Sequence, residues 1–312
     1  MLSTCRTLAS ATIRSLPRVK GVGKAADLVN DLFLQLKCDP LALVPMQLGH
    51  SMIVDTRTLT EARSLYTGDY DGAKIGLLIA LMQEGSVFLD VGANVGFYTV
   101  PLARVARQKH GKVFAFEPLP SNFQRLQENI RLNGLEDTIS VIPVGLSSAF
   151  GEATITLRED FLLGGETGNA AILIADGRDE KYPSRQIQLE TLDELRSASI
   201  DRVDLIKIDV EGHEDHVLKG GAKTIARHRP IVMIEIGGDY FERRGIDLYR
   251  EVRAALPDGY RAYLPVSAAG IMGGDRFSAL RETQSFAIGE TDNAFLIPDE
   301  KRSLVTRVTP LV

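Results

Sequence analysis

The sequence predicts an α/β protein with a mostly parallel sheet, helices on both faces of that sheet, and an N-terminal helical extension. Two observations lead to this fold class. From about residue 86 onward, short apolar segments alternate with longer stretches of helical periodicity, which is typical of parallel strands joined by crossover helices. Several of the apolar segments are hydrophobic at nearly every position, as expected for strands buried on both faces.

The apolar segments define five strands of the predicted sheet. They are Val87–Val91, Lys112–Phe116, Ile139–Val144, Leu205–Val210 and Ile231–Ile236. Helical periodicity between them predicts three helices, Tyr98–Arg107, Ser121–Leu132 and Asp215–Ala226. Two late segments, Arg261–Val266 and Asn293–Ile297, are expected to complete the sheet as an antiparallel hairpin.

Residues 1–80 form the predicted extension, which caps a main domain of residues 81–312. Helices are expected at Asp27–Leu36 and at Lys74–Gln83, the second ending before the helix-stopping Gly85. No chemical motif is recognisable in this part. Its first 26 residues contain no acid and resemble either a transit peptide or a basic amphipathic helix. Their basic residues are Arg6, Arg14, Arg18, Lys20 and Lys24.

Residues 157–188 interrupt the alternation of strands and helices. This stretch contains scattered charges and four glycines, Gly164, Gly165, Gly168 and Gly177. Long connections in compact domains are often functional lids. We therefore expect an insertion that acts as a lid, or alternatively a surface excursion without a role.

Composition narrows the classes of function. The formal net charge of -5 gives no reason to expect nucleic acid as a partner, because binding its phosphates requires a concentrated basic face. The two cysteines, Cys5 and Cys38, form no metal-binding pattern or disulfide framework, which favours a reducing, cytoplasmic location. No apolar run approaches the roughly 20 residues of a membrane span. Nothing in the sequence defines an oligomeric state.

A glycine-containing loop follows the first predicted strand. In an open α/β sheet, ligands bind beyond the carboxyl ends of the strands, and glycine allows a ligand to approach the backbone closely. Gly92 and Gly96 have GxxxG spacing, whereas a dinucleotide site requires GxGxxG, so a nicotinamide cofactor is disfavoured. The candidate ligand-binding residues are Asp90, Gly92, Ala93, Asn94, Gly96, Phe97, Glu117 and Pro118.

Glu117 stands at the carboxyl end of the second predicted strand. An acid at this position can accept hydrogen bonds from both hydroxyl groups of a ribose. The alternative is that Glu117 caps the helix that begins near Ser121. A loop followed by such an acid indicates a nucleoside-containing ligand more specifically than either feature alone.

A second group of polar residues occurs in the segment LIKIDVEGHE, residues 205–214. Strand alternation places Lys207 and Asp209 on one face, and a buried ammonium needs a carboxylate partner, here Asp209 or Glu235. The candidate catalytic residues are Lys207, Asp209, Glu211, His213 and Glu235. They can supply a general base, with His213 titrating near neutrality, or the last four can hold a divalent metal ion. The alternative is a structural Lys207–Asp209 pair and a helix-capping Glu211.

Five ordered motifs resemble the FkbM family of methyltransferases. They are DVGANVGFYT, AFEPLPSNFQRLQENIRLNGL, ETLDEL, LIKIDVEGHEDHVLKGG and IVMIEI, between Leu81 and Ile236, with a weaker echo at Asn293–Ile297. The resemblance implies a class I, Rossmann-like methyltransferase fold with six parallel strands and one antiparallel strand. It further implies S-adenosylmethionine as methyl donor and O-methylation of a hydroxyl on a sugar, a glycan or a natural product.

Under this resemblance, Asp90, Gly92, Asn94 and Gly96 match the donor-binding loop, and Glu117 matches the ribose-binding acid. Residues 1–80 and 157–188 lie outside the motifs and are expected to select the acceptor. Two other functions remain open, a nicotinamide-dependent oxidoreductase and a catalytically silent methyltransferase fold that binds a partner. The absence of an Asn/Asp-Pro-Pro-Tyr/Phe run disfavours N-methylation.

Overall fold

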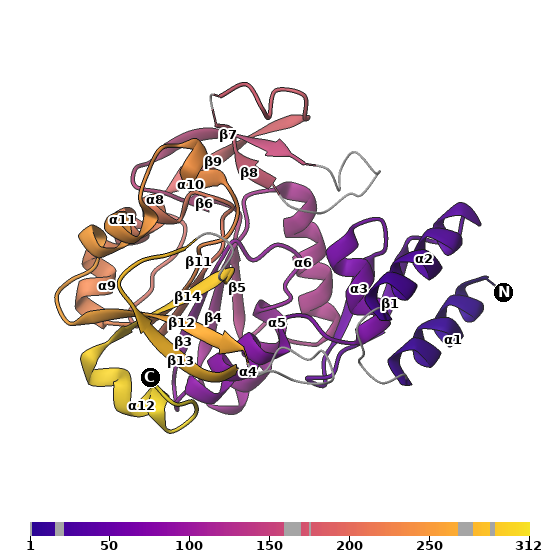
Figure 1. Ribbon diagram of the computed structural model, residues 1–312, viewed down its shortest axis with the longest axis horizontal. Helices are drawn as coiled ribbons and strands as arrows, with labels where there is room; N and C mark the ends of the chain where they lie inside the picture. Colours follow the sequence, from indigo (N-terminus) through magenta and orange to yellow (C-terminus); the bar gives the residue numbers. More distant parts are fainter. Residues whose placement is uncertain (1, 16–21, 159–169, 175, 268–276, 288–290) are drawn as a thin grey trace.

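The computed structural model describes residues 2–15, 22–158, 170–174, 176–267, 277–287 and 291–312. Its main element is an eight-stranded sheet with the order β13-β12-β14-β11-β10-β3-β4-β5 (Figure 1). The strands in chain order are β3 (Val87–Val91), β4 (Lys112–Phe116), β5 (Ile139–Ile142), β10 (Leu205–Ile208), β11 (Ile231–Glu235), β12 (Tyr260–Ser267), β13 (Phe277–Thr283) and β14 (Asn293–Pro298). The predicted α/β class and its five apolar strands are confirmed.

The carboxyl-terminal edge of the sheet differs from the expected simple hairpin. β12 and β14 pair in antiparallel fashion as predicted, but β14 lies between β11 and β12. β14 runs against β11, and six strands therefore share one direction, which is the class I methyltransferase arrangement. β13 adds an eighth, antiparallel edge strand that the sequence analysis did not predict.

Helices cover both faces of this sheet because neighbouring strand residues point to opposite sides. Phe88 packs on one face and Leu89 on the other, each within a separate apolar core. One face is covered by α4 (Gly72–Leu81), α5 (Thr99–Gln108) and α6 (Pro120–Leu132). The other is covered by α8 (Glu214–Gly220), α9 (Ala222–His228) and α11 (Leu248–Ala255).

The single helix predicted at Asp215–Ala226 is two helices, α8 and α9. They meet at the Gly220–Gly221 pair. A Cβ atom on Gly220 would lie 1.9 Å from the backbone oxygen of Ser147, so this close approach requires glycine. The glycine pair weakens helical continuity, because glycine loses more backbone entropy in a helix than other residues do.

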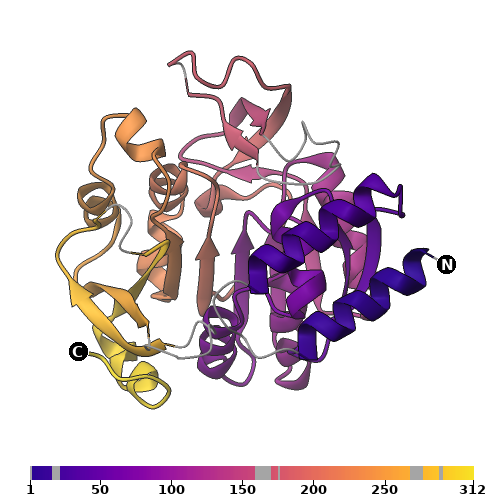
Figure 2. The same cartoon turned by 45° about the vertical axis from the view of Figure 1, so that its right-hand side comes forward.

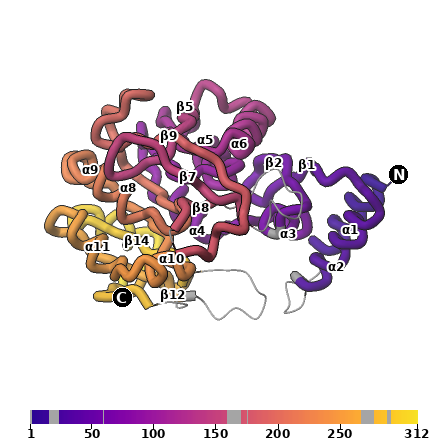
Figure 3. The backbone as a smooth tube through the Cα atoms, turned by 90° about the horizontal axis from the view of Figure 1, so that it is seen from above, coloured from indigo at the N-terminus to yellow at the C-terminus, as the bar shows by residue number. Residues whose placement is uncertain are grey.

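The N-terminal extension contains more than helices. Helices α1 (Leu2–Ser15) and α2 (Val22–Gln35) lie side by side (Figure 2), at the end of the molecule opposite to α12 (Arg302–Thr306; Figure 3). They are followed by an antiparallel hairpin of β1 (Leu41–Pro45) and β2 (Ser51–Asp55), and by α3 (Leu59–Thr67). The extension was expected to be helical, and its β1–β2 hairpin was not predicted.

Hydrogen bonds join the extension to itself and to the main domain. The Arg14 guanidinium donates to the backbone oxygens of Leu65 and Pro45. Arg18 and Lys20 lie outside the described residues. The buried side chain of Asn129, on α6, accepts from the backbone NH of Ile53 at 2.7 Å and donates to the backbone oxygen of Val95 at 2.9 Å.

A smaller four-stranded sheet lies above the main sheet (Figure 1). Its strands are β6 (Gly145–Leu146), β7 (Gly151–Leu157), β8 (Ala170–Ile172) and β9 (Ser184–Glu190). This sheet begins before the insertion expected at 157–188. Gly164, Gly165 and Gly168 lie outside the described residues. Within the described part of the chain, none of the helices is long and apolar enough to cross a membrane.

Candidate active site

A cavity of about 520 Å³ opens at the carboxyl ends of β3, β4, β10 and β11, between the extension and the small sheet. This volume falls in the usual range for small-molecule sites, roughly 300–1,000 Å³. Its wall contains most of the candidate residues from the sequence: Gly92, Ala93, Asn94, Phe97, Glu117, Pro118, Lys207, Asp209, Glu211, His213 and Glu235. Asp90 and Gly96 are not among its described lining residues.

The loop after β3 is held against the neighbouring strands by its backbone. The NH groups of Gly92 and Ala93 both donate to the backbone oxygen of Phe116, at 3.1 and 2.9 Å. Gly92 has a φ of 78°, and a Cβ atom there would lie 1.9 Å from the backbone oxygen of Asp209. Only glycine satisfies both the left-handed conformation and this contact.

Asn94 links the loop to the acid at the end of β4. Its backbone NH donates to Glu117 Oε2 at 2.8 Å, and its φ is 50°. The side-chain Oδ1 of Asn94 is buried without a hydrogen-bond partner among the described residues, although Asn94 lines the cavity. Because an orphaned buried acceptor is costly, this atom fits a site completed by a ligand donor.

Glu117 is buried but faces the cavity. Its Oε1 accepts from the backbone NH of Leu119 at 3.0 Å, just before α6, and α6 itself has no side-chain N-cap bond. Burial raises the pKa of Glu117 to about 7, although hydrogen bonds from Leu119 and Asn94 oppose that rise. The carboxylate therefore changes charge near neutral pH.

Lys207 is buried in the middle of the sheet beneath the loop. Its Nζ lies 3.3 Å from Asp209 and 3.4 Å from Asp90, and it donates to the backbone oxygen of Gly92 at 2.8 Å. Burial alone would lower the pKa of Lys207, but attraction to Asp209 and Asp90 outweighs it and raises the pKa. The predicted pairing with Asp209 is confirmed, whereas the second partner is Asp90 rather than Glu235.

Asp90 has a structural position behind the cavity. It is fully buried, and the Thr99 hydroxyl donates to its Oδ2 at 2.6 Å. Burial raises the pKa of Asp90, while Lys207 lowers it. Asp90 thus connects β3, β10 and the start of α5 beneath the ligand-facing loop.

Three carboxylates converge on the other side of the cavity. Oxygens of Asp209, Glu211 and Glu235 all lie within 4.8 Å of one another. Burial and then Asp209 raise the pKa of Glu211, and the same two causes raise the pKa of Glu235 well above its usual value. A hydrogen bond with Asp209 also contributes to the rise in the pKa of Glu235.

His213 does not join the three carboxylates, although it reaches the cavity wall. A hydrogen bond of 2.9 Å connects its Nε2 to the Ser147 hydroxyl, and its ring stacks on His216 at 4.2 Å. Burial, with the nearby His216, lowers the pKa of His213 to about 3. Burial thus moves the pKa of His213 away from its unperturbed value, and the group of described residues that can hold a metal has three acids without the histidine.

Glu214, which was not among the candidate residues, holds the turn after β10. Its buried carboxylate accepts from the backbone NH groups of Val210 at 2.9 Å and Gly212 at 3.3 Å. These bonds close the turn that places Glu211 at a φ of 57°. The alternative role of Glu211 as a helix cap is not seen, because the Tyr240 hydroxyl donates to its carboxylate instead.

The extension contributes five described residues to the cavity wall, although its sequence carries no recognisable chemical motif: Thr60, Arg63, Tyr70, Asp71 and Lys74. Tyr70 stacks on Phe97 with ring centroids 4.2 Å apart. The Asp71 carboxylate accepts from the Tyr98 hydroxyl at 2.8 Å and pairs with Lys74 at 3.1 Å. The only local signal was the short polar run GDYDG before α4, which carries no recognisable spacing.

The sequence agrees with a known family over the part that builds this cavity. Residues 90–264, more than half of the chain, match the model of the methyltransferase FkbM domain. The chain belongs to the FkbM methyltransferase family. The matched part begins at Asp90 and includes both the loop after β3 and the turn after β10 that carries Asp209 and Glu211.

Curated relatives support this family membership. The hexuronic acid methyltransferase AglP of Haloferax volcanii is 32% identical over 149 residues, which cover 47% of this chain and 54% of the relative. The methyltransferase sdnD of Sordaria araneosa is 27% identical over 170 residues, 46% of this chain and 62% of the relative. The matches thus span between half and two thirds of these relatives.

One solved structure carries the same family name. It is a methyltransferase FkbM from Methylobacillus flagellatus KT, 20% identical to this chain, with a TM-score of 0.42. The match covers 69% of this chain and 44% of that protein.

Proposed function

We propose that this protein is an S-adenosylmethionine-dependent O-methyltransferase that acts on a hydroxyl group of a sugar, glycan or natural product. The observation that carries the proposal is the pairing of Glu117 with the backbone NH of Asn94 at 2.8 Å, on the wall of the cavity. In this contact, an acid that can accept hydrogen bonds from a ribose lies beside a glycine-containing loop whose Asn94 Oδ1 is unpartnered among the described residues.

The residues present fit the donor. Glu117 can accept hydrogen bonds from both ribose hydroxyls, and Asn94 can accept one from a polar group of the ligand. Apolar wall residues of the small sheet, with Val144 after β5, offer a surface for a flat ring next to Pro118. When bound, S-adenosylmethionine supplies an electrophilic methyl group.

The three carboxylates have different chemical roles in this proposal. Asp209 pairs with Lys207, and burial together with Asp209 favours the neutral form of Glu235 by raising its pKa. Glu211 remains as the proton acceptor, because its raised pKa brings it closer to the pH at which a general base is most effective. Glu211 takes the proton that the acceptor hydroxyl loses while the acceptor oxygen gains the methyl group.

The acceptor class rests on the polar groups around these acids and on the relatives. Asp71, Tyr70 and Asp209 line the same cavity and can hold the hydroxyl groups of a polyol, with Tyr70 as an aromatic surface. AglP is named for a hexuronic acid substrate. A sugar acid is therefore the first acceptor to test.

Binding of S-adenosylmethionine is expected in the micromolar range and should strengthen as the pH rises through about 7. The sign follows from the pKa of Glu117, which burial raises to about 7, because only the ionised carboxylate accepts from both ribose hydroxyls. Affinity should then level off above pH 8. Calorimetry at several pH values measures this, and Glu117→Gln should lower the affinity by roughly tenfold to a hundredfold.

An oxidoreductase would give a different result in the same instrument. If the protein bound NADH and not S-adenosylmethionine, the proposal would be wrong. Donor binding without turnover of any hydroxylated acceptor would instead indicate the silent, partner-binding alternative.

Methyl transfer is expected to survive removal of divalent cations, with turnover changed by less than about twofold in EDTA. The physical reason is that protein groups already pair with two of the three carboxylates, Asp209 with Lys207 and Glu211 with the Tyr240 hydroxyl, while burial and Asp209 favour the neutral form of Glu235 by raising its pKa. The check is an initial-rate assay before and after chelation, followed by addition of Mg²⁺. Loss of turnover in EDTA with recovery in Mg²⁺ would assign Asp209, Glu211 and Glu235 to a metal site.

A further inference from the structure

Tyr240 lies within the matched residues 90–264 but beyond the last of the five sequence motifs. It is not among the described residues that line the cavity, yet it contacts the turn that carries Glu211. It begins α10 (Tyr240–Arg243), a short helix after β11. Its hydroxyl donates to Glu211 Oε2 at 2.6 Å. We propose that Tyr240 is a positioning residue for methyl transfer, which fixes the Glu211 carboxylate toward the acceptor and connects it to the small sheet. This inference rests on the role of Glu211 in the proposed function.

The Tyr240 ring is fitted to the turn as closely as its hydroxyl is. A Cβ atom on Gly212 would lie 2.3 Å from Tyr240 Cβ, and one on Gly238 would lie 2.8 Å from the ring. Both glycines have positive φ, 94° and 75°. Tyr240 is buried, so two glycines make room for one ring that has no freedom to turn away from Glu211.

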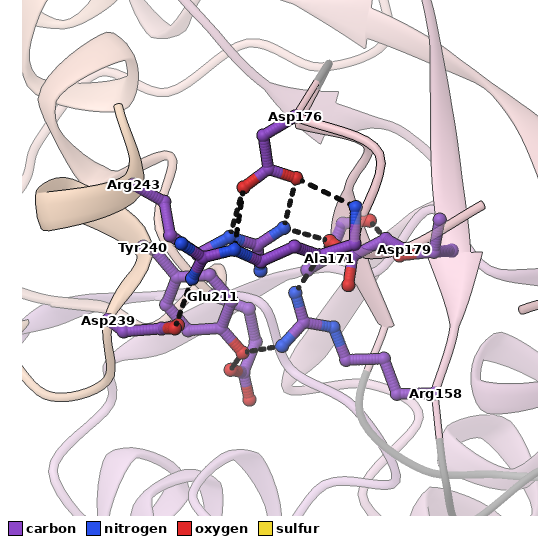
Figure 4. A network of polar contacts seen from close by, with 10 residues as sticks. Arg158, Ala171, Asp176, Asp179, Glu211, Asp239, Tyr240 and Arg243 are labelled. Atoms are coloured by element: carbon purple, nitrogen blue, oxygen red, sulfur yellow. Dashed lines mark hydrogen bonds and ion pairs between the residues drawn. The ribbon is translucent and has the colours of Figure 1, made fainter. Parts of the chain in front are cut away.

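The small sheet holds the same hydroxyl from the other side. Arg158, which follows β7, donates to the Tyr240 hydroxyl at 2.5 Å, and its guanidinium lies 4.5 Å from the ring centroid. An arginine that donates to a phenol oxygen strengthens the bond that the phenol donates onward, because hydrogen bonds in a chain polarise one another. Arg158, Tyr240 and Glu211 therefore form a directed chain from the small sheet to the base (Figure 4).

A second arginine fixes the position of these hydrogen-bonded residues. Arg243, also on α10, donates to both oxygens of Asp176 at 2.8 and 2.9 Å and to Asp179 at 2.8 Å. Asp179 also pairs with Arg158 at 3.3 Å (Figure 4). Arg243 and Asp179 are both buried, so their ion pair is shielded from solvent and holds α10 against residues 176–179.

The test compares Tyr240→Phe with the wild-type full chain. The variant keeps the ring between Gly212 and Gly238 and removes only the hydroxyl. With D-glucuronic acid as the acceptor probe, we expect kcat to fall about tenfold or more, because a hydrogen bond to a charged group is lost. The KM for S-adenosylmethionine should stay within about twofold, since Glu117 and Asn94 are untouched. A fall in donor affinity with unchanged kcat would overturn the proposal.

Tyr260→Phe is the matched control. Its buried hydroxyl donates to the backbone oxygen of Pro230 at 2.7 Å, away from the cavity, so this variant loses a comparable bond without touching Glu211. Its kcat should stay within about twofold of the wild-type value. Equal losses of kcat in both variants would mean that the Tyr240 hydroxyl acts only through the stability of the fold, which would contradict a positioning role.

A double-mutant cycle tests the connection to the small sheet. Arg158→Met alone should lower kcat severalfold, and in the Tyr240→Phe background it should add less than about twofold, because the two residues act in one chain. If the effects of the two substitutions on kcat were independent and multiplied, Arg158 would not act through Tyr240. The proposed connection to the small sheet would then be wrong.

A structural measurement separates this inference from the acceptor assignment. Crystals of wild type and Tyr240→Phe with S-adenosylhomocysteine should show the Glu211 carboxylate displaced in the variant, with the Gly212 backbone in place. An unmoved Glu211 carboxylate would overturn the inference whether or not glucuronic acid is methylated. If wild type turns over no hydroxylated acceptor, the proposed function fails, and the position of Glu211 still decides the role of Tyr240.

Discussion

Replacing Gly92 with alanine is expected to abolish measurable binding of S-adenosylmethionine. The new methyl group would start 1.9 Å from the backbone oxygen of Asp209, and the φ of 78° is unfavourable for any residue with a Cβ atom. The contacted oxygen belongs to the backbone and cannot swing away as the end of a flexible side chain could. The backbones after β3 and β10 must therefore separate. That separation also breaks the bond from Lys207 to the backbone oxygen of Gly92.

The measurement is donor titration by calorimetry on protein shown to be folded by circular dichroism. The matched control is Gly134→Ala, where φ is also positive, 61°, but no atom lies within 4 Å of the added Cβ. Gly134→Ala should cost about 1 kcal/mol of stability and leave donor affinity unchanged. Donor binding by Gly92→Ala within about threefold of wild type would mean that the loop does not contact the donor.

Lys207→Met should destabilise the fold by roughly 3–5 kcal/mol, because it leaves the buried Asp90 without its cation. The loss should be larger at pH 8 than at pH 5. Burial already raises the pKa of Asp90 above its unfolded value, and removing Lys207 raises it further. A folded-state pKa above the unfolded one means that protonation favours the fold, so stability is present at low pH and is lost as the pH rises through the folded pKa.

Urea unfolding at both pH values tests this prediction. Lys219→Met is the control, because Lys219 also bridges two acids, Asp215 and Glu251, at 3.3 and 2.7 Å but is partly exposed. An exposed bridge is worth about 0–1 kcal/mol, so this variant should be nearly as stable as wild type. Similar losses in both variants, or a loss for Lys207→Met that does not depend on pH, would contradict the assignment of a buried ion triad.

The local sequence pattern was sufficient to predict the strands and the loop after β3. β3 and β4 begin and end at the predicted residues, because continuous apolar runs bounded by glycine and by acids define a buried strand. Alternation along β10 likewise placed Lys207 beside Asp209. These features depend only on residues that are neighbours in the chain.

The missed features depend on which distant segments become neighbours. Asp90 pairs with Lys207 because β3 and β10 are adjacent with these two residues in register, although more than 100 residues separate them. Tyr70 reaches the cavity from the extension, and Tyr240 reaches Glu211 from beyond β11. His213 titrates far from neutrality because burial, which sequence spacing does not report, lowers its pKa.

If the proposed function holds, the carboxamide of Asn129 is expected to couple acceptor selectivity to donor affinity. One side chain holds the hairpin backbone at Ile53 and the loop backbone at Val95. A change in the hairpin that alters which acceptors fit would move this amide and tilt the loop. Engineering a new acceptor preference through the hairpin would therefore change donor binding as well, and the two properties would have to be optimised together.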